Sequence, residues 1–306
     1  MKAERIHTFG GPEVLSLEEV PKPQPKDNEL LIRVQAAGVN PVDWKIREGF
    51  ISNMSLPSIL GEDFSGVVEA VGPEVKNFRR GDLVFGEVAD NSGSYAEYAI
   101  APASQVAKKP AALDFLQAAA LPVASLTAWQ ALFDVANLES GQKVLIHAAA
   151  GGVGGFAVQF AKLKGAHVIG TASAENADYV RQLGADEAID YHAVKFEDFV
   201  RDADVVLDTI GGETQNRSWT ILKRGGILVS VVEPPAQEKA AAHGVRGVFM
   251  RSDHSRSDEL ALIADLVANG QVKVTVAKVL PLPEAPQAQQ LSQSGHMRGK
   301  IVLSIS

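Results

Sequence analysis

The spacing of apolar and polar positions changes character after about the first third of the chain. Before that point, residues 30–36 (LLIRVQA) and 63–71 (DFSGVVEAV) form short apolar or alternating runs, which predict strands. Turn-forming residues separate these runs, including the prolines within 21–25 and the pair Gly72-Pro73. Strands at irregular spacing with little helix predict a β-rich, partly open barrel.

From about Leu126 onward, apolar runs alternate with stretches of helical spacing. The helical stretches are 156–163, which ends at Gly165, and 178–183. The predicted strands are 144–148, 167–171, 187–190, 204–208, 226–232 and 245–250. Apolar strands that alternate with amphipathic helices indicate a parallel sheet covered on both faces, so we expect a doubly wound α/β domain.

The last fifty or so residues change pattern once more. Residues 257–268 predict a helix, with Ser257 at its N-cap and Asn269-Gly270 as its stop signal. Strand-like stretches follow at 272–276, 280–286 and 300–305. We therefore expect residues 1–122 and 273–306 to form one domain, and residues 123–272 to form the doubly wound, dinucleotide-binding domain.

The segment 147–156 (HAAAGGVGGF) lies between the first predicted parallel strand and a helix expected to begin near Phe156. A dinucleotide-binding loop needs small residues for a tight turn, for close approach of the backbone to a pyrophosphate and for close helix packing. Ala149, Gly151 and Gly154 occupy these positions, and the helix N-terminus offers free amides to an anion. The alternative is a glycine-rich turn that only packs well.

The tip of the second predicted strand bears on the choice between NAD and NADP. NAD sites usually place an acid about 20 residues after the loop, where it binds the ribose hydroxyls. Here the strand tip carries no acid, and Ser173 can donate a hydrogen bond to a 2′-phosphate. One or two such bonds, at about 1.5–3 kcal/mol each, favour NADP by about tenfold or more. Glu175 follows closely and the nearest downstream base is Arg181, which both weaken the argument, but we expect NADP(H).

Composition narrows the classes of function. The 306 residues carry a formal net charge of −8, which disfavours bulk binding of nucleic acid. The chain has no cysteine, so disulfides, iron–sulfur clusters and thiolate-ligated zinc are excluded. Neither a signal-peptide pattern nor about 18 consecutive apolar residues is visible, so we expect a cytoplasmic enzyme. The histidines lack metal-ligand spacing, and no GxSxG or HExxH motif supports a hydrolase or metalloprotease.

A series of motifs along nearly the whole chain carries a family resemblance. They are the opening 1–25, AGVNPVD at 37–43, GEDFSGVV at 61–68, GDLVF at 81–85, AAALP at 118–122, LTA at 126–128 and the glycine loop. In this order they resemble the zinc-free quinone oxidoreductase branch, which includes zeta-crystallin, of the medium-chain dehydrogenase/reductase superfamily. The resemblance implies a GroES-like fold for the β-rich catalytic domain. It also implies zinc-independent reduction of quinones or α,β-unsaturated carbonyls with NADPH.

Zinc-dependent members of that superfamily carry a cysteine near the position of Asp43 and a histidine near that of Glu62. They also carry a cysteine-rich lobe, where this chain has a short uninterrupted segment. Asp43 and Glu62 could ligate a hard cation, but two carboxylates without histidine are more often hydrogen-bonded loop groups. We therefore expect no metal site.

The resemblance also assigns cofactor contacts. It implies that Asn40 and Thr127 approach the nicotinamide and its ribose or phosphates, and that Ser173 and Tyr191 bracket the 2′-phosphate. The expected pyrophosphate contacts are Ala150, Gly151, Gly152 and Val153. Two departures bear on this assignment. Ala177 stands where bacterial members often have a lysine for the 2′-phosphate, and Lys45 replaces a tyrosine that these enzymes often carry.

Hydride transfer puts negative charge on the substrate oxygen, which a hydrogen-bond donor stabilises. Asn40 and Lys45, expected in a loop after a strand, are the candidate catalytic donors. The alternatives are a turn residue before Pro41 for Asn40 and a solvated surface lysine for Lys45. For His147, at the end of the first parallel strand, a cofactor contact and a packed histidine both stay open. Trp129 is expected in the core rather than in a substrate pocket.

Two alternative functions stay open beside the reductase. One is an enoyl or 2-alkenal reductase of the same fold, and the other is a protein that binds NADPH with little turnover. In each case the expected partner is a small molecule, and neither nucleic acid nor a membrane is expected. Relatives commonly dimerise through the edge strand of the dinucleotide domain, for which 245–250 is the candidate, so we expect a homodimer.

Overall fold

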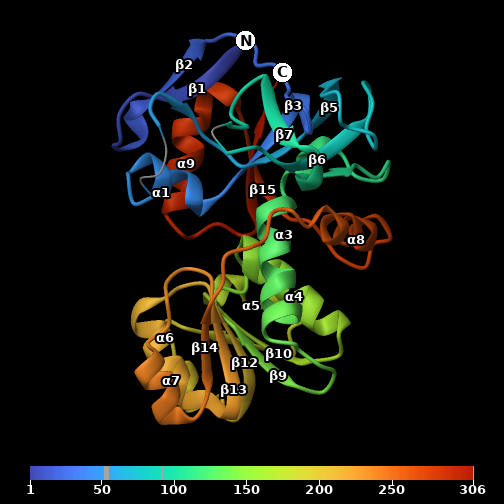
Figure 1. Cartoon of the computed structure of the whole chain (residues 1–306). Coiled ribbons are helices and arrows are strands. Elements are labelled where there is room, and N and C mark those ends of the chain that lie inside the picture. The colour runs from blue at the N-terminus through green and yellow to red at the C-terminus, as the bar shows by residue number, and fades with distance from the viewer. Residues whose placement is uncertain (52–54, 91, 306) are drawn as a thin grey trace. The chain divides into compact units, whose positions relative to one another are not determined.

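The computed structural model describes residues 1–51, 55–90 and 92–305, and backbone contacts divide the chain into two units (Figure 1). Unit 1 comprises Met1–Ala124 and Asp253–Ser306, and unit 2 comprises Ser125–Ser252. The domain boundaries expected from the sequence stay a prediction. By contacts, the segment 253–272 groups with unit 1, because its helix packs against a strand of that unit.

Unit 2 lies entirely within the described residues and contains a six-stranded parallel sheet in the order β11-β10-β9-β12-β13-β14. Its strands are β9 (Lys143–Ile146), β10 (His167–Ala172), β11 (Glu187–Asp190), β12 (Ala203–Asp208), β13 (Leu222–Ser230) and β14 (Arg246–Phe249). The strand order reverses between β9 and β12. In open α/β sheets, ligands bind at such a switch point, beyond the carboxyl ends of the strands.

Helices cover both faces of this sheet, with α6 and α7 on one side and α4 on the other (Figure 1). The helices are α4 (Gly152–Leu163), α5 (Ala177–Gln182), α6 (Gly212–Ser218) and α7 (Gln237–His243). The core between sheet and helices is made of aliphatic side chains from the strands together with Trp219, which is almost completely buried. The predicted doubly wound α/β domain is therefore confirmed.

The described part of unit 1 is rich in β-structure. Its larger sheet runs β15-β16-β3-β5-β6-β8, with β7 also paired to β3, and a smaller sheet runs β2-β1-β4. All pairs except β15–β16 are antiparallel. The strands are β1 (Lys2–Ile6), β2 (Leu15–Glu19), β3 (Glu29–Val39), β4 (Ser58–Ile59), β5 (Asp63–Val71), β6 (Leu83–Glu87), β7 (Tyr98–Pro102), β8 (Val106–Lys108), β15 (Val276–Pro281) and β16 (Lys300–Ser304). This matches the β-rich domain expected beside the doubly wound one.

Short helices complete the two units. Unit 1 contains α1 (Pro41–Arg47), α2 (Phe115–Ala119), α8 (Ser257–Ala268) and α9 (Ala285–Gln293), and the boundary between the units falls within α3 (Pro122–Trp129). Single turns of 3₁₀-helix are Pro12–Val14, Ala103–Gln105, Ala174–Asn176, Phe196–Asp198, Trp219–Ile221 and Leu282–Glu284, and Gln130–Val135 is a π-helix. None of the described helices is long and apolar enough to span a bilayer.

Near the C-terminus, several elements differ from the prediction. The stretch 272–276 is not a strand, and β15 begins only at Val276. The stretch 280–286 is expected to be extended, but β15 ends at Pro281 and α9 begins at Ala285. Pro286 lies in the first turn of α9, where a helix needs no amide hydrogen. Helix α8 lies where predicted, but Arg256 is its N-cap and Ser257 is its first residue.

Candidate functional site

The glycine loop of unit 2 joins β9 to α4 and is shaped by two close approaches. A Cβ atom at Gly154 would lie 2.2 Å from the carbonyl oxygen of Ala148, so only glycine fits there. A Cβ atom at Gly170, in β10, would lie 2.7 Å from the Cβ of Ala149. The loop therefore lies directly against the neighbouring strand. A tight turn and a helix packed close to the sheet are what a dinucleotide-binding loop requires.

The second half of the loop is the first turn of α4, which begins at Gly152 after the N-cap Gly151. The predicted start near Phe156 is wrong, because the low helix propensity of glycine is outweighed by the close packing at Gly154. The amide of Gly151 donates to Ala148 O at 2.9 Å. The N-cap is a glycine and has no side chain to cap the amides that follow, so the N-terminus of this twelve-residue helix can receive an anion.

The four expected pyrophosphate contacts lie together in this turn. Ala150 is buried, while Gly151, Gly152 and Val153 are partly exposed. The partly exposed backbone lies beyond the carboxyl end of β9, next to the switch point of the sheet. This is the place where the fold class binds its ligands.

Ser173 and Tyr191 lie at the same edge of the sheet. They directly follow Ala172 and Asp190, the last residues of β10 and β11, which are partners in the parallel ladder. The Tyr191 amide donates to Ala172 O at 3.2 Å, and the side chain of Tyr191 is 48% exposed. The Ser173 hydroxyl accepts a hydrogen bond from Asn176 Nδ2 at 3.0 Å. The structure thus brings the two expected 2′-phosphate contacts to neighbouring strand ends.

Basic side chains are scarce at this edge. Ala177, in the place of the family's frequent lysine, is the first residue of α5. Arg181 lies one turn further along that helix and pairs with Asp178 at 3.0 Å. Recognition of a 2′-phosphate at this edge would therefore depend on hydroxyl groups rather than on a free cation.

His147 is a packed, neutral histidine at the end of β9. Its Nδ1 lies 3.1 Å from the Thr171 hydroxyl and its Nε2 lies 2.9 Å from the Ser218 hydroxyl. Ser218 donates its own hydrogen to Thr214 O, so Nε2 carries the proton and Nδ1 accepts from Thr171. Burial lowers the pKa of His147 to about 4. Of the two alternatives for this residue, the structure therefore favours the packed histidine.

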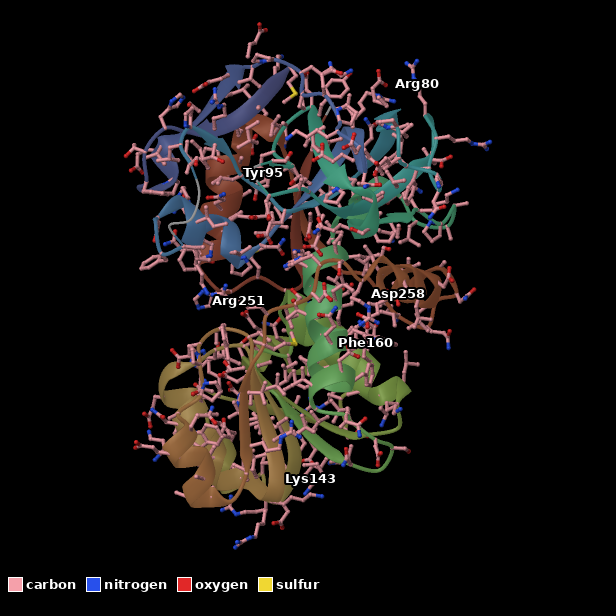
Figure 2. All side chains as sticks on the ribbon, in the orientation of Figure 1. Arg80, Tyr95, Lys143, Phe160, Arg251 and Asp258 are labelled. Carbon is pink, nitrogen blue, oxygen red and sulfur yellow. The ribbon has the colours of Figure 1, made fainter. Side chains whose placement is uncertain are left out.

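Thr127 is buried in α3. Two residues along the same helix, Trp129 packs edge-on against Phe133 and Phe160, with ring centroids 4.6 and 5.2 Å apart. Phe160 belongs to α4 and is labelled in Figure 2. Trp129 therefore packs among aromatic side chains of unit 2, but it is half-buried rather than fully in the core as predicted.

The other expected site residues lie in unit 1, around a buried ion pair between β5 and β16. The ammonium of Lys300 lies 3.3 Å from Asp63 Oδ2, and both side chains are almost completely buried. Asn40 joins them, since its Nδ2 donates to Asp63 Oδ2 at 2.9 Å and its Oδ1 accepts from Lys300. Val39 O also accepts from Lys300, and Asp63 Oδ1 accepts from the Val123 amide. Full hydrogen bonding is the condition under which a buried ion pair is tolerated.

Asp43 is a further buried carboxyl group. Its Oδ2 accepts hydrogen bonds from the Asn40 amide at 2.7 Å and from the hydroxyl of Tyr95 at 2.8 Å. Figure 2 labels Tyr95 within unit 1. Burial raises the pKa of Asp43 to about 7, and these two hydrogen bonds oppose the shift. Asp43 is thus a hydrogen-bonded group.

In the described parts of the chain, no three His, Asp or Glu side chains are arranged to hold a metal ion.

The expectation that Lys45 lies in a loop is wrong. Asn40 follows β3 directly as the N-cap of α1, and Pro41 is the first helical residue, because both residue types favour these positions. Lys45 therefore lies on a helix, half-buried, with its ammonium 5.7 Å from the Trp44 ring. Asn40 is both the residue before Pro41 and a member of the buried hydrogen-bond network.

A cavity of about 460 Å³ in unit 1 combines Glu62 with two residues, Glu87 and His254, that no sequence motif marks. Its wall combines apolar side chains with a carboxylate–imidazole group, namely Ile46, Ile51, Ile59 and Leu60 with Glu62, Glu87 and His254. Within this group, Glu87 Oε2 and His254 Nδ1 are joined as an ion pair. His254 is 167 residues away from Glu87 in the chain, and a single histidine without a spacing motif gives no signal in the sequence.

The charges in this cavity interact strongly. Burial, followed by the negative charges of Asp43 and Glu87, raises the pKa of Glu62 to about 8. The hydrogen bond to Glu87 raises the pKa of His254 to about 9. At neutral pH the cavity therefore holds a protonated carboxyl group beside an ion pair, and it can both donate and accept protons.

Two family models match the chain. Residues 26–111 match the alcohol dehydrogenase GroES-like domain, and residues 183–303 match the zinc-binding dehydrogenase model. The second description names zinc, but this chain contains no cysteine. The two matches fall mainly in different parts of the chain, the first within unit 1 and the second across both units.

Full-length similarity is found to quinone oxidoreductases. The chain is 38% identical to the quinone oxidoreductase of Sus scrofa, over 99% of this chain and 97% of the relative. The solved quinone oxidoreductase from Coxiella burnetii is 38% identical with a TM-score of 0.94, covering 100% of this chain and 99% of that one. The Escherichia coli quinone oxidoreductase complexed with NADPH is 31% identical with a TM-score of 0.93, covering 99% and 100%.

Proposed function

The chain belongs to the zinc-free quinone oxidoreductase branch of the medium-chain dehydrogenase/reductase superfamily, and we propose that it reduces quinones or α,β-unsaturated carbonyls with NADPH. The observation that carries this proposal is the glycine loop. A Cβ atom at Gly154 would fill the space between the helix and the end of the strand. The relative from E. coli, whose structure contains NADPH, shares the fold over the full chain.

The residues of unit 2 fit a dinucleotide phosphate. The uncapped amides of Gly152 and Val153 would hold its pyrophosphate, with Ala150 and Gly151 lining the same turn. Ser173 and Tyr191 would hold the 2′-phosphate at the adjacent strand ends. Thr127 and Asn40 are the proposed contacts of the nicotinamide end. When bound, the reduced nicotinamide supplies a hydride to the substrate.

On the substrate side, we propose that the cavity of unit 1 takes the acceptor, whose apolar body matches the isoleucine-rich wall. Negative charge develops on the substrate oxygen during reduction, and a donor aimed at it lowers the barrier. Asn40 has one amide hydrogen on Asp63 and a second one to offer. Lys45 is the other proposed donor.

Gly154→Ala is expected to weaken NADPH binding about tenfold or more, because the added Cβ meets the Ala148 carbonyl and moves the loop. Gly155→Ala is the matched control, since its added Cβ would make only ordinary contacts, the nearest with a Leu183 methyl group at 3.5 Å. NADPH fluorescence titration measures both. Wild-type affinity in Gly154→Ala would show that the cofactor does not use this loop.

The wild-type protein is expected to bind NADPH about tenfold more tightly than NADH, because hydroxyl groups at the strand ends can donate to the 2′-phosphate. Ser173→Asp should reverse this preference, since a carboxylate repels the phosphate and accepts hydrogen bonds from a free ribose hydroxyl. Paired titrations with both cofactors measure the ratio, and NADH serves as the internal control for an intact site. Equal affinities in wild type and variant argue against this assignment.

Stopped-flow oxidation of bound NADPH by a panel of soluble quinones and enals tests the reaction itself. We expect turnover of quinones, and a loss of about 10- to 100-fold in kcat for Lys45→Met and for Asn40→Ala as a donor is removed. Faster turnover of a short 2-alkenal than of any quinone would favour an alkenal reductase. Complete inertness would leave an NADPH-binding protein without catalysis.

A homodimer is proposed through β14, the edge strand of the unit 2 sheet, whose outer side pairs with no strand among the residues that the structure describes. Light scattering should then give about twice the chain mass of 32.5 kDa. A mass near 32.5 kDa at micromolar concentration would contradict it.

A further inference from the structure

The proposed reaction needs a proton source. Hydride supplied to a quinone or an enone leaves negative charge on the substrate oxygen, and the reduced product forms only when a proton follows. Glu62 lines the cavity of unit 1 and is half-buried. Its carboxyl group receives no hydrogen bond from the residues that the structure describes. It is therefore available to a ligand in the cavity.

A second observation points to a ligand in the same cavity. Glu87 lines it with a side chain only 3% exposed. One oxygen of Glu87, Oε2, pairs with His254, while the other, Oε1, is buried without a hydrogen-bond partner among the described residues. A buried hydrogen-bond acceptor that has no donor lowers the stability of the folded protein. A ligand with a hydroxyl group, as a reduced quinone has, would satisfy it.

We propose that Glu62 is the acid that delivers the proton to the substrate oxygen in this cavity, whose wall also contains the Glu87–His254 ion pair. This inference rests on the proposed function. The hydride brings one hydrogen and two electrons to the substrate, and NADPH is oxidised to NADP⁺. The O–H bond of Glu62 breaks as an O–H bond forms on the substrate. The Glu62 carboxylate then takes up a proton from solvent before the next turnover.

The surrounding charges favour the acid form of Glu62. Burial is the largest cause, followed by the negative charges of Asp43 and Glu87 and a smaller effect of Asp63, while His254 opposes them; together they raise its pKa to about 8. Since the protonated form is the active one, turnover should be full at lower pH and fall as the pH rises through about 8. Asp90 also lines the cavity and is exposed, so it is the competing candidate.

Variants of Glu62 test the assignment in the full-length protein with NADPH. Glu62→Gln should lower kcat about 10- to 100-fold and remove the fall in rate above pH 8. Glu62→Asp keeps an acid and should retain part of the rate and a fall at high pH. Glu74→Gln is the matched control, because Glu74 is an exposed carboxylate of unit 1 that pairs with Asn28. It should behave as wild type.

A readout independent of turnover is the infrared band of a protonated carboxyl group. Asp43, with a pKa of about 7, also contributes to this band, so the band of Glu62 is the difference between wild type and Glu62→Gln. This difference should be present at pH 7 and disappear as the pH rises through about 8. Glu62→Ala serves the same measurement if the glutamine variant does not fold. NADPH affinity should be unchanged in each variant. A lower rate with unchanged NADPH affinity then shows that the proton donor is lost, and not the binding of the cofactor.

Three results would overturn the assignment. One is an unchanged pH profile in Glu62→Gln, and another is an infrared band of equal size in wild type and Glu62→Gln at pH 7. The third is loss of the high-pH fall in Asp90→Asn rather than in Glu62→Gln. A wild-type protein that oxidises NADPH with no quinone or enone would instead reject the proposed function, and this inference with it.

Discussion

The buried contact between Asp63 and Lys300 fixes the geometry of unit 1 where its expected site residues lie. The two residues are 237 positions apart in the sequence, and their strands, β5 and β16, flank β3 in the larger sheet. Asn40 stands at the end of β3 and binds both, so its carbonyl faces the ammonium and its amide faces the carboxylate. Removal of either charge would leave the other buried without an opposite charge, at a cost of about 3–5 kcal/mol in folding free energy. The orientation of Asn40 is thus imposed by its neighbours.

A second set of carboxyl groups surrounds this contact, and the environment of each gives it a different role. Asp63 has a cationic partner, Asp43 has two hydrogen-bond donors, and Glu62 has neither. Burial makes the charged form of a carboxyl group less favourable, and an opposite charge or hydrogen-bond donors reduce this free-energy cost. Zinc-dependent members of the superfamily carry a cysteine and a histidine near positions 43 and 62. In this chain both positions carry carboxyl groups, whose pKa values are raised to about 7 and about 8. Burial therefore raises the proton affinity of two carboxyl groups near the Asp63–Lys300 contact.

The sequence predicts unit 2 better than unit 1, for physical reasons. Buried parallel strands form continuous apolar runs, and the glycine loop has small residues at fixed spacing, so both are local signals. The start of α4 is missed because the reason for it, the contact of Gly154 with Ala148, appears only once the loop is folded. Helix α9 (Ala285–Gln293, APQAQQLSQ) is missed because most of its residues are polar, so it shows no clear apolar period. The Glu87–His254 pair joins distant segments and leaves no pattern in the chain.

The place of β16 in the larger sheet bears on how the protein is made. Unit 2 is one continuous segment, so it can fold as soon as it leaves the ribosome. β16, in contrast, pairs with β3 and β15 and supplies Lys300, yet it is translated near the end. Until then β3 lacks a neighbour and Asp63 lacks its cation. The N-terminal segment is consequently the first to be synthesised and the last to be completed, and nascent chains interrupted before residue 300 should depend on chaperones.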